Sequence, residues 1–199
     1  MQKTYLCIDL KSFYASVECV ELGLDPFKVN LVVADPTRGG GAITLAATPA
    51  IKKLGVSSRG RIFEIDPKIE YMVAPPRMHL YMEYSCKVYK VFLEFIAKED
   101  IHVYSIDESF LDITSYLKLY QVNAKELAKK ILDRIYEKTG LTATVGIGTN
   151  LYLAKIAMDI SAKHNADRMA YLNEDLYRQT LWHHVPLTDF WMLGNGTER

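Results

Sequence analysis

The chain has 199 residues, of which 49% are hydrophobic and 24% are charged, and this balance excludes an intrinsically disordered protein. Its 24 basic and 24 acidic residues give a formal net charge of zero, which counts against a module that grips DNA alone, because such modules are usually basic. No apolar run is long enough to cross a membrane, so no membrane partner is expected. Three scattered cysteines fit a reduced, cytoplasmic protein.

The predicted elements begin with an apolar strand over residues 5–10, in which Asp9 is the only charged residue. A turn and a helix follow, up to about residue 23. Four short elements come next and are separated by glycine and proline residues. They are a strand at 29–34, a strand at 42–47, a helix that begins at Pro49 with Thr48 as its N-cap, and a strand at 69–73.

The second part of the chain carries longer elements. Apolar residues at helical spacing predict one helix over 78–97 and another over 123–138, with a β-hairpin between them. A strand at 141–147 and a helix at 151–160 follow. When residues 29–73 are set aside, the order is strand, helix, helix, strand, strand, helix, strand. This order is close to a ferredoxin-like βαββαβ plan, so we predict an α+β fold with a small α/β insertion.

The most informative feature is a pair of adjacent acids, Asp107 and Glu108, between two apolar runs that read as the hairpin strands. Neighbouring strand residues point to opposite faces, so two adjacent carboxylates converge only at a turn or a strand end. Two like charges there favour a divalent cation with oxygen ligands, above all Mg²⁺. If the first strand lies beside the hairpin, Asp9 joins the pair. Asp112 is expected to be structural, because strand alternation would turn it away from the hairpin acids.

Three stretches resemble, in order and separation, the motifs of the Y-family (translesion) DNA polymerases, and of their bacterial UmuC-like branch in particular. They are Ile8–Glu18, Ser105–Asp112, and Val145–Asn150 together with Leu153–Ala157. The resemblance extends from about Thr4 to the C-terminal residues.

The resemblance also implies a domain organisation. Residues 1–28 and 74–185 would form the palm, residues 29–73 the fingers, and residues 186–199 the start of the thumb. The rest of the thumb and the little-finger domain are expected outside this chain. We therefore expect a palm and fingers fragment that polymerises weakly or not at all by itself.

By this resemblance the protein is a template-directed, error-prone DNA polymerase of DNA repair and damage tolerance, with dNTPs and primer–template DNA as its substrates. Asp9, Asp107 and Glu108 are the expected catalytic acids and, with the backbone carbonyl of Leu10, would hold two Mg²⁺ ions, for which Mn²⁺ is expected to substitute. A processivity clamp is an expected partner, through a C-terminal region absent from this sequence.

Two adjacent aromatic residues are the candidates for contact with the nucleotide sugar. Tyr14 matches the family's sugar gate, whose ring leaves no room for a 2′-hydroxyl, the group that distinguishes RNA from DNA precursors. Phe13 would pack beneath the base or sugar. For both residues, a core role at the start of a helix is the alternative.

Three residues are candidates for phosphate contacts. Lys52 stands where the family has a basic contact to the triphosphate, and Thr48 could bind a phosphate from the helix N-terminus. Lys163 matches the family's second phosphate lysine only if this chain carries one inserted residue within the stretch from Asp159 to Lys163. A solvated helical lysine is the alternative for Lys52. Lys155 either pairs with an acid or contacts the template.

Two other functions stay open at this point. A ferredoxin-like nucleotide cyclase would also carry acids on a hairpin turn and bind Mg²⁺, but it would need neither DNA nor a sugar gate. A catalytically inactive, polymerase-like binding protein is the second alternative, and the three intact acids argue against it.

Overall fold

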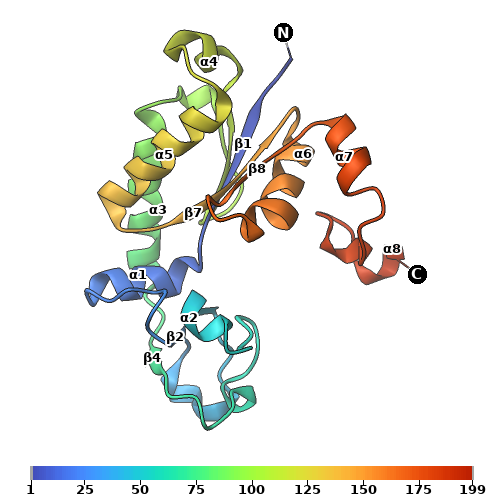
Figure 1. Ribbon diagram of the computed structural model, residues 1–199. Coiled ribbons are helices and arrows are strands. Elements are labelled where there is room, and N and C mark those ends of the chain that lie inside the picture. The colour runs from blue at the N-terminus through green and yellow to red at the C-terminus, as the bar shows by residue number, and fades with distance from the viewer. Residues whose placement is uncertain (1, 199) are drawn as a thin grey trace. The chain divides into compact units, whose positions relative to one another are not determined.

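The computed structural model describes residues 2–198 (Figure 1). The chain divides into two compact units. The first contains the chain up to Leu10, Tyr89–Ile135 and the chain from Thr142 onward; the second contains Lys11–Val88 and Tyr136–Leu141. The second unit is larger than the predicted insertion at 29–73, because it includes the helix that follows the first strand. The division into palm, fingers and thumb stays a prediction, and its end residues 1 and 199 lie outside the described part.

The first unit is built on a five-stranded sheet with the order β5-β6-β1-β7-β8. Its strands are β1 (Tyr5–Leu10), β5 (Ile101–Val103), β6 (Glu108–Asp112), β7 (Ala143–Gly148) and β8 (Met169–Leu172). β1 lies between β6 and β7 and is antiparallel to both, β5 and β6 form the antiparallel hairpin, and β8 runs parallel to β7. In chain order, β1, α3, β5, β6, α5 and β7 follow the βαββαβ plan, which confirms the predicted α+β fold.

Two faces of this sheet are covered differently (Figure 1). On one side lies α6 (Leu151–Ile156), which packs on β7 and β1. On the other lies α5 (Ala124–Thr139), whose residues Leu127, Ile131 and Ile135 are buried at helical spacing. The sheet residues therefore divide by strand alternation into those that face α6 and those that face α5.

The close approach of α6 depends on two glycines of β7. A Cβ atom on Gly146 would lie 1.9 Å from the carbonyl oxygen of Ala154, and one on Gly148 would lie 2.2 Å from the Ala154 nitrogen. Side chains at these positions would collide with helix backbone, which cannot move aside as a flexible side chain can. The strand sequence Val-Gly-Ile-Gly thus fixes which face of β7 receives the helix.

The other helices of the first unit are short and lie between strands or after β8. They are α4 (Thr114–Tyr120), α7 (Glu174–Thr180) and α8 (Asn195–Glu198). α3 (Met78–Leu93) and α5 have residues in both units. α4, β8 and α7 were not predicted, and β8 depends on its pairing with β7 more than on any local pattern. Within residues 2–198, no helix combines the length and the apolar character that crossing a membrane requires.

The second unit contains α1 (Phe13–Glu21), α2 (Pro49–Lys52) and a three-stranded sheet with the order β3-β2-β4. The strands are short: β2 is Leu31–Val33, β3 is Ala46–Ala47 and β4 is Met72–Ala74. A small apolar core lies between this sheet and α2 and includes Val32, Ala47, Ile51 and Ile65.

Candidate active site

The three predicted acids meet at one end of two neighbouring strands. In the register of β1 and β6, Asp9 lies opposite Glu108. The Leu10 amide continues this pairing and donates a hydrogen bond to the Asp107 carbonyl oxygen at 2.9 Å. The predicted neighbourhood of the first strand and the acidic hairpin is therefore confirmed at the level of the backbone.

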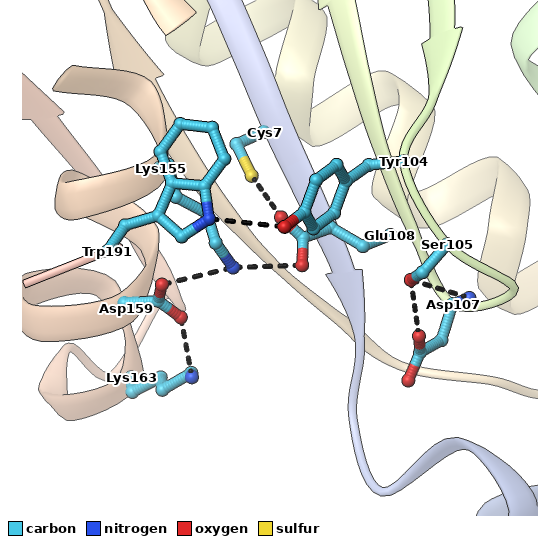
Figure 2. Close-up of polar contacts among 9 residues, drawn as sticks. All are labelled: Cys7, Tyr104, Ser105, Asp107, Glu108, Lys155, Asp159, Lys163 and Trp191. Atoms are coloured by element: carbon cyan, nitrogen blue, oxygen red, sulfur yellow. Dashed lines mark hydrogen bonds and ion pairs between the residues drawn. The ribbon is translucent and has the colours of Figure 1, made fainter. Parts of the chain in front are cut away.

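A tight bend sets the positions of the two hairpin acids. The amides of Tyr104 and Ser105 both donate to the Glu108 carbonyl oxygen at 3.0 Å, which closes the turn. Asp107 is in the bend, and its carboxylate accepts a hydrogen bond from the Ser105 hydroxyl at 2.7 Å (Figure 2). Glu108 is the first residue of β6. The two adjacent acids thus lie on either side of the point where strand alternation begins.

The carboxylate of Glu108 is buried and both of its oxygens are engaged. Oε1 accepts from the Cys7 thiol at 3.2 Å, and Oε2 accepts from the Lys155 ammonium at 2.8 Å. Figure 2 shows the Glu108 carboxylate turned towards Lys155, while the Asp107 carboxylate lies beside Ser105. This direction follows from the register, because Cys7 and Glu108 are on the face of the sheet that α6 covers.

Lys155 is the site residue that the sequence-based assignment left open. α6 begins after Asn150, whose side chain accepts the Leu153 amide at 2.8 Å, and this cap places Lys155 over the β1–β6 strand pair. The ammonium contacts Glu108 and, at 3.0 Å, Asp159. Burial alone would lower the pKa of Lys155, but the hydrogen bonds to Glu108 and Asp159 raise it above its ordinary value. Lys155 is therefore a buried cation paired with two acids.

A π-helical turn explains the irregular spacing before Lys163. α6 continues through a π-helical turn at Ala157–Ser161, which holds one residue more than an α-helical turn. The predicted one-residue insertion between Asp159 and Lys163 overlaps this turn. The Lys163 ammonium contacts Asp159 Oδ1 at 2.9 Å (Figure 2). Lys163 is thus brought to the same acidic cluster as Lys155.

The carboxyl group of Asp9 is partly buried beside the other two acids. Burial raises its pKa to about 7; Lys163 opposes this shift, and the neighbouring charges of Asp107 and Glu108 add to it. Repulsion between neighbouring carboxylates is relieved by a divalent cation, so the chemistry of this donor set fits a hard metal ion.

The side chains do not, however, form a closed metal cage in this conformation. Among residues 2–198, no three His, Cys, Asp or Glu side chains are grouped so that they could hold a metal ion. In this conformation Glu108 is bound to Lys155, so the three carboxylates do not converge on one point, and a site made of all three acids stays a prediction. Asp9 and Asp107 are the acids that could hold a cation without breaking that ion pair.

The second unit contains the candidate sugar gate. The ring of Tyr14 is stacked on Tyr81, and the Tyr81 hydroxyl donates to buried Glu18 at 2.6 Å. Arg77 also binds Glu18, through Nε at 3.0 Å. Phe13 is only 3% exposed, so it is a core residue, as its alternative interpretation holds, and does not present a surface to a nucleotide. Tyr14 is half-buried, which leaves part of its ring accessible.

The two predicted phosphate contacts of this unit have different outcomes. The exposed Lys52 lies at the end of α2, and its ammonium donates to the Ser12 hydroxyl at 3.0 Å, directly before α1. Thr48 is fully buried; its hydroxyl donates to the Val29 carbonyl at 2.7 Å and accepts the Leu31 amide at 3.1 Å. Thr48 occupies the predicted N-cap position of α2, but its side chain caps no helix amide. Its hydroxyl is used to hold β2 and, being buried, is not available to a phosphate.

Strand alternation does not turn Asp112 away from the hairpin acids, so that part of the prediction is wrong. Glu108 and Asp112 are four residues apart on β6 and face the same side of the sheet. Asp112 is nevertheless at the other end of the strand, opposite Tyr5. There its carboxylate accepts from the amide and hydroxyl of Thr114, and these hydrogen bonds, with the charge of Lys3, lower its pKa despite partial burial.

An aromatic residue near the C-terminus completes the surroundings of the ion pairs. The Trp191 indole donates to the Tyr104 hydroxyl at 3.2 Å (Figure 2). Its ring also lies near the rings of Phe110 and Tyr152. Trp191 belongs to the predicted thumb segment, yet it packs on the hairpin that carries the acids. No local pattern could have identified this contact, since 87 residues separate Trp191 from Tyr104.

Comparisons with known proteins agree on one family. The sequence model of the impB/mucB/samB family matches residues 8–159. Two relatives come from Bacillus subtilis (strain 168). The protein named UV-damage repair protein UvrX is 38% identical over all of this chain, and DNA polymerase IV 2 is 38% identical over 98% of it. The chain spans 46% of the length of each of these relatives.

Solved structures give the same result for the fold. The crystal structure of DinB from Sulfolobus solfataricus superposes with a TM-score of 0.78 at 25% identity, over 98% of this chain and 55% of DinB. An insertion ternary complex of Dbh DNA polymerase also has a TM-score of 0.78 at 25% identity, over 97% of this chain and 55% of that polymerase. The chain therefore spans little more than half the length of either structure.

Proposed function

The chain belongs to the impB/mucB/samB family, and on that premise we propose that it forms the palm and fingers of a Y-family DNA polymerase of the translesion type. The protein would insert dNTPs opposite template DNA in DNA repair and damage tolerance. The observation that carries this proposal is the placement of Asp9 opposite Glu108, with Asp107 in the adjoining bend. Acids at one end of neighbouring strands suit nucleotidyl transfer at a metal site.

Four groups of this chain would hold the metal ions. They are the carboxylates of Asp9 and Asp107, the backbone carbonyl of Leu10, and the carboxylate of Glu108 once it leaves Lys155. When bound, two Mg²⁺ ions, or Mn²⁺ in their place, would lower the pKa of the primer 3′-hydroxyl and neutralise the triphosphate. The raised Asp9 pKa supports this role, because burial, its main cause, and the neighbouring charges of Asp107 and Glu108 all disfavour a carboxylate that no cation neutralises.

Two lysines and one aromatic ring would hold the incoming nucleotide. Lys163 lies beside the acids and would bind the triphosphate, and Lys52 is our second candidate for a phosphate contact. Tyr14 would exclude a 2′-hydroxyl through its half-exposed ring. The support for Tyr14 is its fixed orientation on Tyr81, because steric exclusion requires a ring that cannot swing aside.

The remaining parts of the proposal concern organisation and partners. We keep residues 1–28 and 74–185 as palm, 29–73 as fingers and 186–199 as the start of the thumb. Primer–template DNA is the proposed partner, and the ternary complex of Dbh DNA polymerase supports this by analogy. A processivity clamp stays a prediction. No observation favours a nucleotide cyclase, and the relatives and structural neighbours named above are repair proteins and polymerases.

Primer extension by the full-length protein that contains this chain tests the function. Asp107→Ala and Glu108→Ala should each lower nucleotide incorporation about 100-fold or more, as the loss of an electrostatic contact in the transition state does. Asp133→Ala is the matched control, because Asp133 is an exposed acid of α5 paired only with Lys129 in the described contacts. Extension at wild-type rates by both acid variants would overturn the proposal.

A further inference from the structure

We propose that Lys155 is a positioning residue that competes with a bound divalent cation for the Glu108 carboxylate, and that Asp159 sets the outcome of this competition. The inference rests on the proposed function, because it concerns the same acids. It goes further by assigning a role to two residues that lie outside the expected ligand set.

The first observation is that the ion pairs form an alternating row of charges. Glu108, Lys155, Asp159 and Lys163 follow one another at 2.8, 3.0 and 2.9 Å (Figure 2). Their formal charges sum to zero. A neutral Cys7 thiol donates to the remaining oxygen of Glu108, and burial together with the Glu108 charge raises the thiol pKa and keeps it protonated. Glu108 is therefore fully satisfied without a metal ion.

The second observation is the conflict at Glu108. Its backbone is opposite Asp9 and adjacent to Asp107, where a third metal-binding carboxylate is expected. Its side chain instead lies against α6 and is bound to Lys155. A metal ion on this carboxylate would lie beside the Lys155 ammonium and repel it, so the two cations compete for Glu108. Glu108 must loosen its ion pair with Lys155 before its carboxylate can serve a metal ion together with Asp9 and Asp107.

Asp159 makes this exchange possible. If Glu108 turns away, a lysine that is only 7% exposed would be left as an isolated buried cation, which is strongly unfavourable. Because Lys155 also contacts Asp159 at 3.0 Å, it keeps one ionic partner after the exchange. Removal of the Asp159 charge would bind Lys155 more tightly to Glu108. Removal of the Lys155 charge would release Glu108 altogether.

Titration of the 199-residue chain with Mn²⁺ tests the inference without any measurement of activity. The loss of the EPR signal of the free ion measures how much Mn²⁺ is bound. Lys155→Met should tighten Mn²⁺ binding roughly tenfold, within the usual range of coupling between sites. Asp159→Asn should weaken Mn²⁺ binding several-fold, and Lys155→Arg should restore wild-type behaviour. Asp133→Asn, which removes an exposed acid of the same unit, should change nothing.

Long-range repulsion or attraction between these charges and Mn²⁺ would change the affinity of each variant in the same direction. A double-mutant cycle with Glu108→Gln separates this explanation from action through Glu108. If Lys155 acts through Glu108, then Lys155→Met and Asp159→Asn have almost no effect on Mn²⁺ binding in the Glu108→Gln background. Equal effects in both backgrounds would mean that the two residues act only by long-range charge, and would overturn the inference.

Two further outcomes are distinguishable. If Lys155→Met does not fold, as circular dichroism would show, the Asp159→Asn arm of the cycle decides by itself, since Asp159 is partly exposed and paired at the surface with Lys163. If the wild-type chain binds no Mn²⁺ at all, the metal site of the proposed function is wrong, and the competition falls with it. Mn²⁺ binding that no variant alters overturns the inference alone.

Discussion

The rings of Tyr14 and Tyr81 are stacked, with their centroids 4.4 Å apart and their planes inclined by 13°. Tyr81 is fully buried and is anchored through its hydroxyl to Glu18, which lies on the same helix as Tyr14. α1 thus carries both the stacked ring and, one turn later, the anchor of its partner. This arrangement orders the Tyr14 side chain before any nucleotide binds.

An ordered Tyr14 ring is expected to set sugar selectivity. Tyr14→Ala in the full-length protein should raise the use of rNTPs relative to dNTPs by orders of magnitude, because the discrimination is steric. Tyr14→Phe is the matched control and should keep the preference, since it keeps the ring. Single-nucleotide insertion with dNTP and rNTP pairs measures the ratio. A ratio that does not change in Tyr14→Ala would refute the gate.

The Glu18 anchor is expected to stabilise the second unit. Glu18 is buried, and Arg77→Ala would leave its carboxylate with the Tyr81 hydroxyl but without its cation. We expect a loss of about 1–3 kcal/mol in the free energy of unfolding. Lys28→Ala, which breaks an exposed ion pair with Asp25, should cost less than about 0.5 kcal/mol. Urea denaturation compares the two; similar losses would show that the buried pair contributes no more than an exposed one.

Gly146 is expected to tolerate no side chain. Its added Cβ would lie 1.9 Å from the Ala154 carbonyl oxygen, so Gly146→Ala must separate α6 from β7. We expect a destabilisation of about 3 kcal/mol or more, at the upper end for overpacked cores. Gly194→Ala in the same unit has open space around the new methyl group and serves as the control. Thermal unfolding checks the pair, and equal melting temperatures would contradict the packing argument.

Asp9 gives a pH dependence whose sign can be stated. Its pKa is about 7 in the folded chain against an ordinary value of 3.8, so the folded state binds a proton that the unfolded state has lost between these values. The contribution of Asp9 to stability therefore falls as pH rises from about 4 to about 7. Asp9→Asn lacks this fall. In EDTA, the variant should melt at a higher temperature than the wild type at pH 8.

The same comparison at pH 4 supplies the control, because this pH is close to the ordinary pKa of 3.8. The unfolded chain has then lost only part of its Asp9 proton, most of the stability difference is absent, and the two proteins should melt at similar temperatures. A constant difference between pH 4 and pH 8 would show that the pKa of Asp9 is not raised.

Much of the fold could be predicted because its signals are local. Alternation and apolar runs located β1 and the hairpin, helical spacing located α3 and α5, and the acids marked the bend. Boundaries were less accurate: α3 ends at Leu93 rather than at residue 97, and β3 has only two residues. β8 was missed because a four-residue edge strand is stabilised mainly by its neighbour, which a local pattern does not reveal.

The sequence by itself determined the family, the βαββαβ order and the positions of three acids at strand ends. Only the tertiary structure decided where the side chains of that site point. Glu108 turns to Lys155 because the register with β1 places it on the face that α6 covers, and Gly146 and Gly148 let α6 approach that face. Thr48 is buried because its hydroxyl meets β2. These directions depend on contacts between segments far apart in the chain, and local propensity carries no information about them.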